Sequence, residues 1–466
     1  MAMDIKSKFA AIRIRHIQVL FMFLLLTIGV GMRVQFSVAL VAMTDETASK
    51  NPNIPVYDWD NKSILLSSFF WGYSALQIIA AMLSRIYGSK SFLIGAMAIN
   101  SMACCLIPLA AEYLGANGVM ISRAVMGLSQ GFFYPSVYNI LAHWIPPSER
   151  AQMGSSALAG GSFGIITGMP ITGFISASWA GWSYSFYFYG TLGFLWIIGY
   201  YYLGASTPAT HPNISKMEQA FIENQMDMNG AELKVPWKAI VTSPAFWAIF
   251  VAYIGQTWGF QTILSELPIY MNKVMKFNME TNGLLSAAPY LTMCLIIFLS
   301  GYLADFLINK NYLMVEQARR IFSFFASFVP ATALVVLSFL PEDYITLCVV
   351  MIIIAIGLQG ASSAGFEINH IDLSPNFAGV LMAICNSCGE VFSNLGPLTV
   401  HFIVTDETNK AQWRIIFLAA ATSYIVSCGI FLTYMRADIQ PWNNVNNIVK
   451  ENENDKNERY IVNKIV

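Results

Sequence analysis

Residues 24–43 read LLLTIGVGMRVQFSVALVAM, and they make up most of a mainly apolar run that begins at Ile17. The run carries one arginine, Arg33, and no acidic residue. A cation at mid-membrane depth costs roughly 2.5–3.5 kcal/mol on insertion scales, and it is usually retained where it faces a protein interior or a watery cavity. The stretch therefore predicts a membrane protein of several helices with a polar site for an anion.

The composition of the whole chain supports a membrane protein. Of its 466 residues, 56% are hydrophobic and 11% are charged, whereas soluble domains carry about 25% charged residues. So little charge cannot cover a soluble surface of this size. The net charge of −1 gives no indication of nucleic acid as a partner.

Apolar stretches long enough to cross a bilayer, at about 20 residues each, recur along the chain. We predict twelve transmembrane helices near residues 17–42, 64–86, 91–111, 117–142, 152–177, 183–204, 244–272, 282–307, 320–341, 345–368, 377–403 and 414–436.

A polar stretch in the middle of the chain divides these spans into two groups of six. We predict an all-α membrane protein with a cytosolic N-terminus (1–16), a six-helix bundle (17–204), a cytosolic linker (205–243), a second six-helix bundle (244–436) and a cytosolic disordered tail (437–466). Short loop motifs recur in the two halves: Gly301-Tyr-Leu-Ala-Asp305 corresponds in position to the loop motif after the second span, and Trp144–Arg150 to His370–Pro375. Six plus six helices in parallel repeats resemble the major facilitator architecture.

The distribution of basic residues indicates the orientation. Arg13 and Arg15 precede the first span, and the loops after the second, fourth and eighth spans also carry lysine or arginine. Since cytosolic loops are enriched in basic residues, we expect both termini in the cytosol. The membrane itself, plasma membrane or vesicle and lysosome membrane, is left open.

Two arginines within the spans are the candidate anion site. At 1.5 Å per residue, Arg33 lies roughly 24 Å from the cytosolic end of its helix, and Arg123 about 9 Å from the outer end of an oppositely directed one. The two therefore reach similar depth, and a guanidinium offers a planar fork of donors for carboxylate or phosphate. The alternatives are a structural arginine bonded to carbonyls and, for Arg123, a side chain that reaches toward the interface.

Further polar residues accompany these arginines. Tyr73 and Gln77, at i and i+4 on the second span, could add hydrogen bonds to a substrate. Gln130 lies at i+7 from Arg123, on the same face of its helix. We include all three among the substrate-binding candidates.

Acidic residues suggest coupling and gating. Glu266 in the seventh span and Glu390 in the eleventh could carry a proton or balance an arginine. Asp305, Glu149 and Arg150 lie at cytosolic helix ends, where we expect ion pairs between helices that gate the site.

Other motifs are less informative. Glycines 160, 164 and 168 in the fifth span have the GxxxG spacing that lets helices approach closely. Seven cysteines lie in apolar stretches, and the one CxxC pair has no second pair or histidine cluster, so we predict no metal site. No nucleophile–base pair stands out, so we predict no enzyme. Asn61-Lys-Ser63 is a weak glycosylation sequon.

Several segments together resemble the anion–phosphate cotransporter family, which includes the vesicular glutamate transporters, sialin, the type I sodium–phosphate cotransporters and insect proteins named as inorganic phosphate cotransporters. The resemblance covers nearly the whole chain. Its segments are Arg33–Val41, Ser68–Tyr73 with Gln77, Arg123 with Gly127–Gly131 and Tyr134-Pro135, Trp144–Arg150, Pro289–Leu291, Gly301–Asp305, Asn369–Pro375 and Ile439–Trp442.

The resemblance implies anion transport by alternating access, driven by protons, sodium or membrane potential, with the arginines that match Arg33 and Arg123 at the anion site. Some family positions differ here. The fourth-helix acids of sialin-like members fall on Met126 and Gln130, the second-helix histidine of the glutamate carriers on Leu66 and their seventh-helix arginine on Gln256. A sialin-type proton relay is therefore absent as such, and glutamate is disfavoured as the cargo.

We accordingly expect an ion-coupled secondary carrier of small anions, either inorganic phosphate or an organic carboxylate, that works as a monomer in a lipid bilayer. It would need no cofactor, although Na⁺ or H⁺ could be the coupling ion. Two alternatives stay open: an anion channel, and a transporter-like anion sensor that no longer moves solute.

Overall fold

The computed structural model describes residues 13–44, 51–59, 62–225, 235–273, 279–341, 344–393, 395–406 and 408–443. Asn61, the side chain of Glu266 and the tail from residue 444 lie outside the described part, so the predictions about them stay predictions. Throughout the described part the regular structure is helical.

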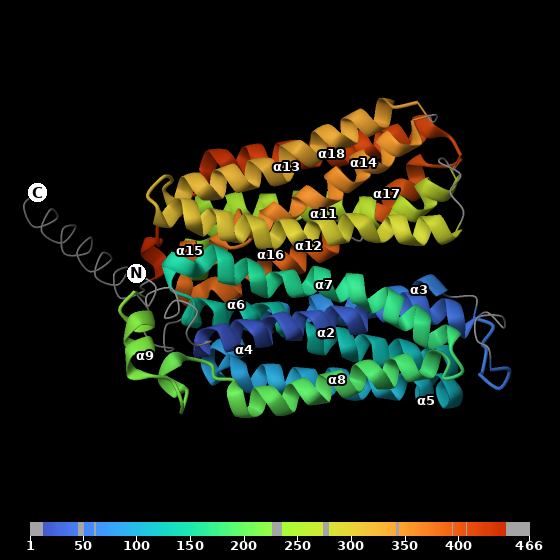
Figure 1. Ribbon diagram of the computed structural model, residues 1–466, viewed down its shortest axis with the longest axis horizontal. Coiled ribbons are helices and arrows are strands. Elements are labelled where there is room, and N and C mark those ends of the chain that lie inside the picture. Colours follow the sequence, from blue (N-terminus) through green and yellow to red (C-terminus); the bar gives the residue numbers. More distant parts are fainter. Residues whose placement is uncertain are drawn as a thin grey trace, which may run out of the picture.

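The first half of the chain forms one bundle (Figure 1). Its elements are α2 (Ile14–Met43), α3 (Lys62–Ala75), α4 (Gln77–Tyr87), α5 (Ser89–Gln130), α6 (Phe133–Trp144), η1 (Pro147–Glu149), α7 (Arg150–Ala177) and α8 (Trp182–Leu203). The connecting segment contains η2 (Pro208–Thr210), α9 (Lys216–Glu223) and α10 (Trp237–Thr242).

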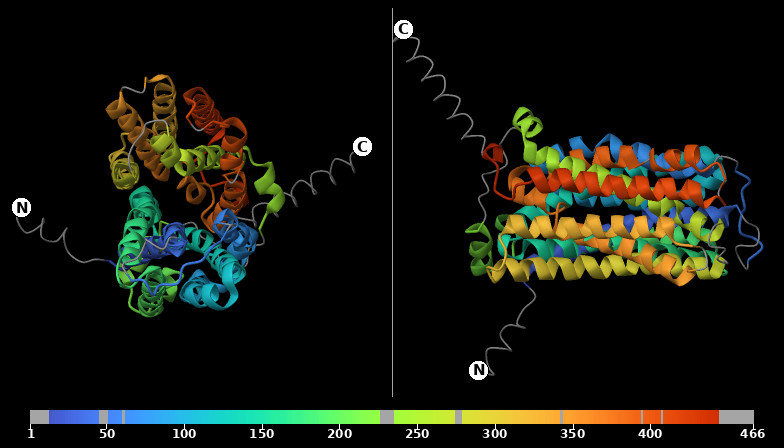
Figure 2. Two further views of the ribbon diagram at one scale, coloured as in Figure 1. Left: turned by 90° about the vertical axis from the view of Figure 1, so that its right-hand side faces the viewer. Right: turned by 90° about the horizontal axis from the view of Figure 1, so that it is seen from above.

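The second half forms a second bundle beside the first, as the end-on view in Figure 2 shows. Its elements are α11 (Pro244–Lys273), α12 (Met279–Asn309), α13 (Val315–Phe339), α14 (Ile345–Gly357), η3 (Leu358–Ala364), α15 (Asn369–Leu373), η4 (Pro375–Phe377), α16 (Ala378–Ser393), α17 (Leu395–Ile403), α18 (Lys410–Tyr434) and η5 (Pro441–Asn443).

Helices fall on each of the twelve predicted spans, although several are bent or broken. α5 covers the third span and most of the fourth, and its direction changes at Gly115, whose φ of 59° suits a residue without a Cβ. α3 and α4 are bent by 47° at Leu76. In the described part, seven helices are long and apolar enough on their own to cross a membrane, or eight with that bent pair.

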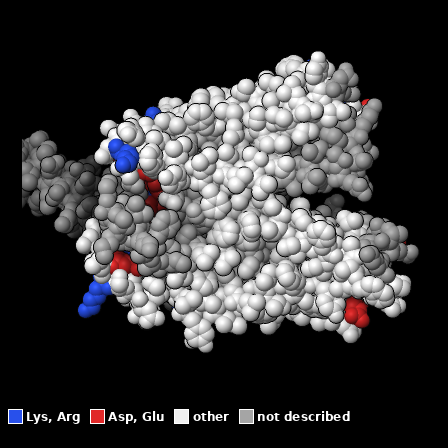
Figure 3. Space-filling model, viewed as in Figure 1, with Lys and Arg blue, Asp and Glu red and all other residues white. Residues whose placement is uncertain are grey.

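The surface in Figure 3 agrees with a membrane belt, because the charged side chains visible on that face lie at the two ends and leave an uncharged band between them. Many large apolar side chains in the helices are exposed, among them Phe174, Leu195 and Leu295. Exposed apolar surface on this scale requires lipid rather than water around the bundle.

The glycine spacing in α7 has the structural effect that the sequence predicts. A Cβ on Gly160 would overlap the backbone oxygen of Phe23 in α2, and a Cβ on Gly164 would lie 2.6 Å from the oxygen of Thr27. α2 and α7 therefore pack backbone to backbone, as small residues at i and i+4 allow.

The folded part extends further toward the C-terminus than predicted. Trp442 is buried beside Phe377, and the side-chain oxygen of Asn443 accepts hydrogen bonds from the Ser374 hydroxyl and from the backbone N–H of Asn376. The predicted start of the disordered tail, residue 437, is therefore too early in the chain, because the buried Trp442 anchors the residues around it to η4. In Figure 1 this last described segment, drawn in red near α15, lies at the end of the bundle where α2 begins, which we call the terminal end.

Candidate functional site

Arg33 lies on α2 at the interface between the two bundles. Its Cζ lies 5.4 Å from the ring centroid of Phe69, 4.6 Å from that of Phe70 and 5.4 Å from that of Tyr73, all on α3. Its Nη1 lies 3.6 Å from Oε1 of Glu390 on α16 of the other half. The ring faces stabilise the cation, and the ion pair joins the two halves at this level.

The ion pair between Arg33 and Glu390 is loose and reachable. The 3.6 Å separation exceeds the 2.7–2.9 Å of a short charge-assisted hydrogen bond. The side chains are 21% and 12% exposed, although both residues lie inside the bundle. The Arg33 guanidinium therefore keeps N–H groups that can donate hydrogen bonds to another anion.

Arg123 on α5 lies next to Arg33. Its Cζ lies 4.4 Å from the ring centroid of Phe36 and 4.9 Å from that of Phe69, and its Nη1 is 3.5 Å from the backbone oxygen of Arg33. Its Nε is buried and has no hydrogen-bond partner among the described residues. Both guanidinium groups thus contact one ring, that of Phe69, consistent with the similar depth predicted for the two arginines.

Tyr73 and Gln77 both contact one residue of the other half. Asn386 on α16 donates hydrogen bonds to the Tyr73 hydroxyl at 2.9 Å and to Oε1 of Gln77 at 2.8 Å. Its own oxygen accepts from the hydroxyl of Tyr253 at 2.8 Å. Tyr73 and Gln77 thus share one helix face, as predicted, and in this conformation that face binds the second half of the protein.

Gln130 lies deeper in the first half. Its amide donates to the backbone oxygen of Gly29 at 2.9 Å and to Oδ1 of Asn100 at 3.3 Å. Like Arg123 it faces α2, in line with the i+7 spacing. Both amide hydrogens already tie helices of one half together, so the geometry favours a structural role for Gln130.

A second charged cluster lies at the terminal end. Asp372, on α15, accepts from Arg150 of the first half at 2.9 Å and from Arg319 of its own half at 2.7 Å. All three side chains are at least 90% buried. We call Arg150, Asp372 and Arg319 the terminal cluster; both of its ion pairs are short and enclosed, and the one between Arg150 and Asp372 joins the halves.

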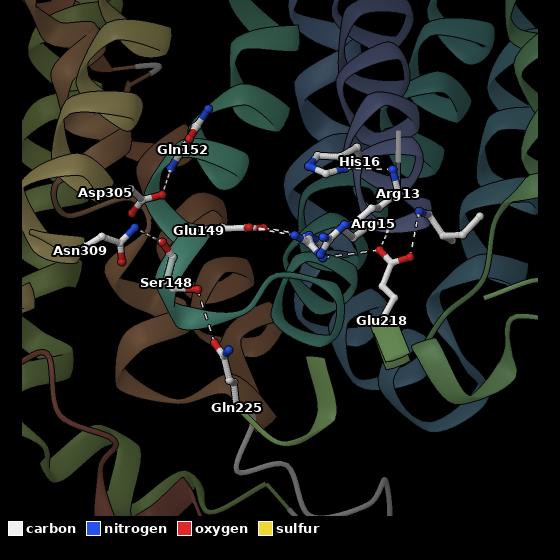
Figure 4. Close-up of polar contacts among 11 residues, drawn as sticks. Arg13, Arg15, His16, Ser148, Glu149, Gln152, Glu218, Gln225, Asp305 and Asn309 are labelled. Atoms are coloured by element: carbon white, nitrogen blue, oxygen red, sulfur yellow. Dashed lines mark hydrogen bonds and ion pairs between the residues drawn. The ribbon is translucent and has the colours of Figure 1, made fainter. Parts of the chain in front are cut away.

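Asp305 on α12 joins the halves beside this cluster. Its two carboxylate oxygens accept from the backbone N–H groups of Ala151 and Gln152 at 3.1 and 2.7 Å. These are first-turn donors of α7, so Asp305 caps a helix of the opposite half. Figure 4 shows this contact next to the hydrogen bond from Asn309 to the backbone oxygen of Ser148.

Glu149 makes its ion pair within the first half. Arg15 of α2 donates two hydrogen bonds of 2.8 Å to Glu149. Glu218 of α9 lies on the other side of Arg15, as Figure 4 shows, and accepts from the backbone nitrogens at the start of α2. Glu149 therefore pairs within the first half and Glu218 ties the connecting segment to α2, whereas Arg150 reaches across the interface.

The two halves are in contact at one end and apart at the other. The described polar contacts between them run from Asn309–Ser148 at the terminal end to Arg33–Glu390. Figure 3 shows the surface hollowed between the halves toward the opposite end. Arg33 and Glu390 thus lie where the contact ends.

Sequence reasoning missed Asp372 and Arg319 as partners of Arg150. The position of Arg319 near a loop suggested an orientation signal, yet its side chain is buried. The recurrence of loop motifs in the two halves was the available signal, because it pairs the segment of Arg150 with that of Asp372. Within the described residues, no group of histidine, cysteine, aspartate or glutamate side chains is arranged to hold a metal ion.

Comparisons with known proteins agree on one family. Residues 19–397 match the Major Facilitator Superfamily. The chain is 35% identical to a Drosophila ananassae protein named "Putative inorganic phosphate cotransporter", over 89% of this chain and 91% of that protein. It is 32% identical to sialin from Homo sapiens, over 88% and 87%.

Solved structures show the same fold at much lower identity. The proton:xylose symporter XylE superposes with a TM-score of 0.68 at 13% identity, over 90% of this chain and 96% of that one. FucP in the outward conformation superposes with a TM-score of 0.67 at 10% identity, over 91% and 100%. At such identities the match supports the fold alone.

Proposed function

Because this chain belongs to the Major Facilitator Superfamily, with inorganic phosphate cotransporters and sialin among its relatives, we propose that it is an ion-coupled secondary carrier of small anions. Its family and relatives are transporters rather than enzymes. The observation that carries the proposal is the convergence of Arg33 and Arg123 on Phe69, beside the ion pair that Arg33 makes with Glu390 of the other half. The substrate class is inorganic phosphate or a small organic carboxylate.

Glu390 acts as an internal counter-ion in this proposal. Arg33 and Arg123 carry two positive charges, and Glu390 supplies one negative charge at 3.6 Å from Arg33. A phosphate or carboxylate could form the two parallel hydrogen bonds that a guanidinium favours. The arriving anion would replace Glu390 on Arg33 and so remove a contact between α2 and α16.

Alternating access would follow from the contacts between the halves. With both termini in the cytosol, the terminal end faces the cytosol and the present conformation is open to the outside. Exposure of the site to the cytosol would require the separation of Arg150 from Asp372 and of Asp305 from α7. The site is built from one chain, and we propose that the monomer is the transporting unit.

Uptake by proteoliposomes tests the proposal. Purified protein should give saturable uptake of labelled phosphate or of a labelled carboxylate, inhibited by unlabelled accepted anions and not by a neutral sugar such as xylose. Two pH values, each with and without sodium, would identify the coupling ion.

The same experiment separates a carrier from the alternatives. A carrier should accumulate the anion above its equilibrium level when a gradient of the coupling ion is imposed. Equilibration without accumulation would indicate a channel, and anion binding without flux would indicate a sensor; either result would contradict the proposal.

A further inference from the structure

The tenth span is broken at membrane depth. α14 ends at Gly357, the chain continues as the 3₁₀ helix η3, and a turn then leads to α15 at Asn369. Short 3₁₀ stretches within a helix often mark functional hinges, and irregular backbone inside a membrane is tolerated only where protein or a cavity surrounds it. Glu367 lies in this turn, and sequence reasoning did not include it among the candidates.

Glu367 differs from its neighbours in exposure. From Gln359 to Ala383 every residue is buried except Glu367, which is partly accessible. Its Oε1 accepts a hydrogen bond of 2.5 Å from the hydroxyl of Ser362. The residue is therefore partly reachable by water while the backbone on both sides of it is enclosed.

Glu367 also differs from the other buried carboxylates. Glu390 faces Arg33, Asp372 faces two arginines, and Asp305 accepts from two backbone N–H groups. Among the described residues, no lysine, arginine or histidine forms an ion pair with Glu367. A carboxylate away from bulk water is costly to keep charged without such a partner.

The surroundings of Glu367 belong to both halves. Tyr138 of α6 donates to its backbone oxygen at 3.1 Å, and Nδ1 of His370 lies 2.8 Å from the same oxygen. The hydroxyls of Tyr134 and Tyr253 lie within electrostatic range, and Tyr134 is also within range of Arg33 and Glu390. Ser362 thus contacts the carboxylate of Glu367, Tyr138 and His370 contact its backbone oxygen, and Tyr134 and Tyr253 interact with it from farther away.

We propose that Glu367 is the proton-coupling residue of the carrier, which makes it a proton–anion symporter. This inference rests on the proposed function and names its coupling ion and the group that binds it. A proton from water on the open side binds the Glu367 carboxylate, so that closure of the halves encloses no lone negative charge. When the carrier opens to the other side, the proton leaves to water there, together with the anion.

Glu390 is left with a different role under this proposal. Its charge is balanced by Arg33 until the anion arrives, so it competes with the substrate and does not carry the proton. The sequence alone could not make this division, because both groups are glutamates within predicted spans.

The test compares Glu367→Gln with wild type in proteoliposomes. With one proton per monovalent anion, a gradient of one pH unit supports up to about tenfold accumulation. Glu367→Gln keeps an acceptor for Ser362 but cannot gain or lose a proton. We expect its accumulation to fall to about onefold and its uptake to lose pH dependence, while exchange of labelled for unlabelled anion persists. Glu367→Asp should restore part of the pH response.

Three further variants make the outcome decisive. Glu316→Gln, at a partly exposed pair with Arg320, serves as the control and should match wild type. Loss of the pH response in Glu390→Gln or in His370→Gln, with a normal response in Glu367→Gln, would overturn the proposal. Wild-type accumulation driven by sodium and indifferent to pH would overturn it as well, yet would leave anion transport standing; only the absence of wild-type flux would remove both.

Discussion

The central site, formed by Arg33, Arg123 and Glu390, and the terminal cluster both place arginines against a carboxylate, but they satisfy the charges differently. In the terminal cluster, Asp372 holds two arginines at 2.7 and 2.9 Å in a fully buried setting. In the central site the ion pair is 3.6 Å long and partly exposed, and aromatic faces supply much of the stabilisation of the cations.

This difference indicates that one region of the fold joins the two halves and another binds the ligand. The ion pairs of the terminal cluster are short and enclosed, so the cluster can act as a closed contact between the halves, although Nε of Arg150 has no hydrogen-bond partner among the described residues. A guanidinium that rests on rings keeps its in-plane donors available. The central site is therefore the one suited to a ligand that comes and goes.

The largest expected effect tests the terminal cluster. Asp372→Asn would leave Arg150 and Arg319 buried without a countercharge, and loss of one partner of a buried pair typically costs about 3–5 kcal/mol. We expect a markedly lower melting temperature in detergent. Glu316→Gln, at a partly exposed i, i+4 pair, should change stability by about 0.3–0.5 kcal/mol. Equal losses of stability in Asp372→Asn and Glu316→Gln would contradict the special status given to the terminal cluster.

A smaller effect is expected at Asp305, where the carboxylate meets backbone donors rather than arginines. Asp305→Ala removes the cap of α7 and should cost about 1–2 kcal/mol. Asp305→Asn retains one acceptor and should cost less. Thermal unfolding of both variants measures the difference, and a loss as large as that of Asp372→Asn would mean that capping contributes as much as the buried ion pairs.

The smallest stability effect is expected at Glu390. Its removal leaves Arg33 on three ring faces and partly accessible to water, so we expect Glu390→Gln to lower stability by about 1 kcal/mol or less. The same melting experiment checks this value. A loss comparable with that of Asp372→Asn would show that Glu390 is a structural partner and would remove the contrast between the two regions.

Much of this arrangement could be predicted from the sequence. The positions of Arg33 and Arg123 along oppositely directed helices predict that they reach similar depth, and the glycine spacing in α7 predicts close contact with a neighbouring helix, which the structure identifies as α2. The i, i+4 spacing of Tyr73 and Gln77 predicts a shared face. Each of these follows from helix geometry within one half of the molecule.

Contacts between the halves could not be predicted in the same way. The pairing of Arg33 with Glu390 and of Asn386 with the face of Tyr73 depends on how the two bundles dock, which helical periodicity does not determine. The break in the tenth span was also not predicted, although Gln359, Ser362 and Ser363 interrupt the apolar residues between Leu358 and Phe366. Glu367 lies at the end of that predicted span and was not singled out.

The most direct test of the central claim is the affinity of purified protein for the transported anion, measured by equilibrium binding in wild type, Glu390→Gln and Arg33→Gln. If the anion replaces Glu390 on Arg33, Glu390→Gln should bind it severalfold more tightly, and Arg33→Gln should bind it at least about 100-fold more weakly, a difference of about 2.7 kcal/mol. Wild-type affinity in a folded Arg33→Gln variant would contradict the account.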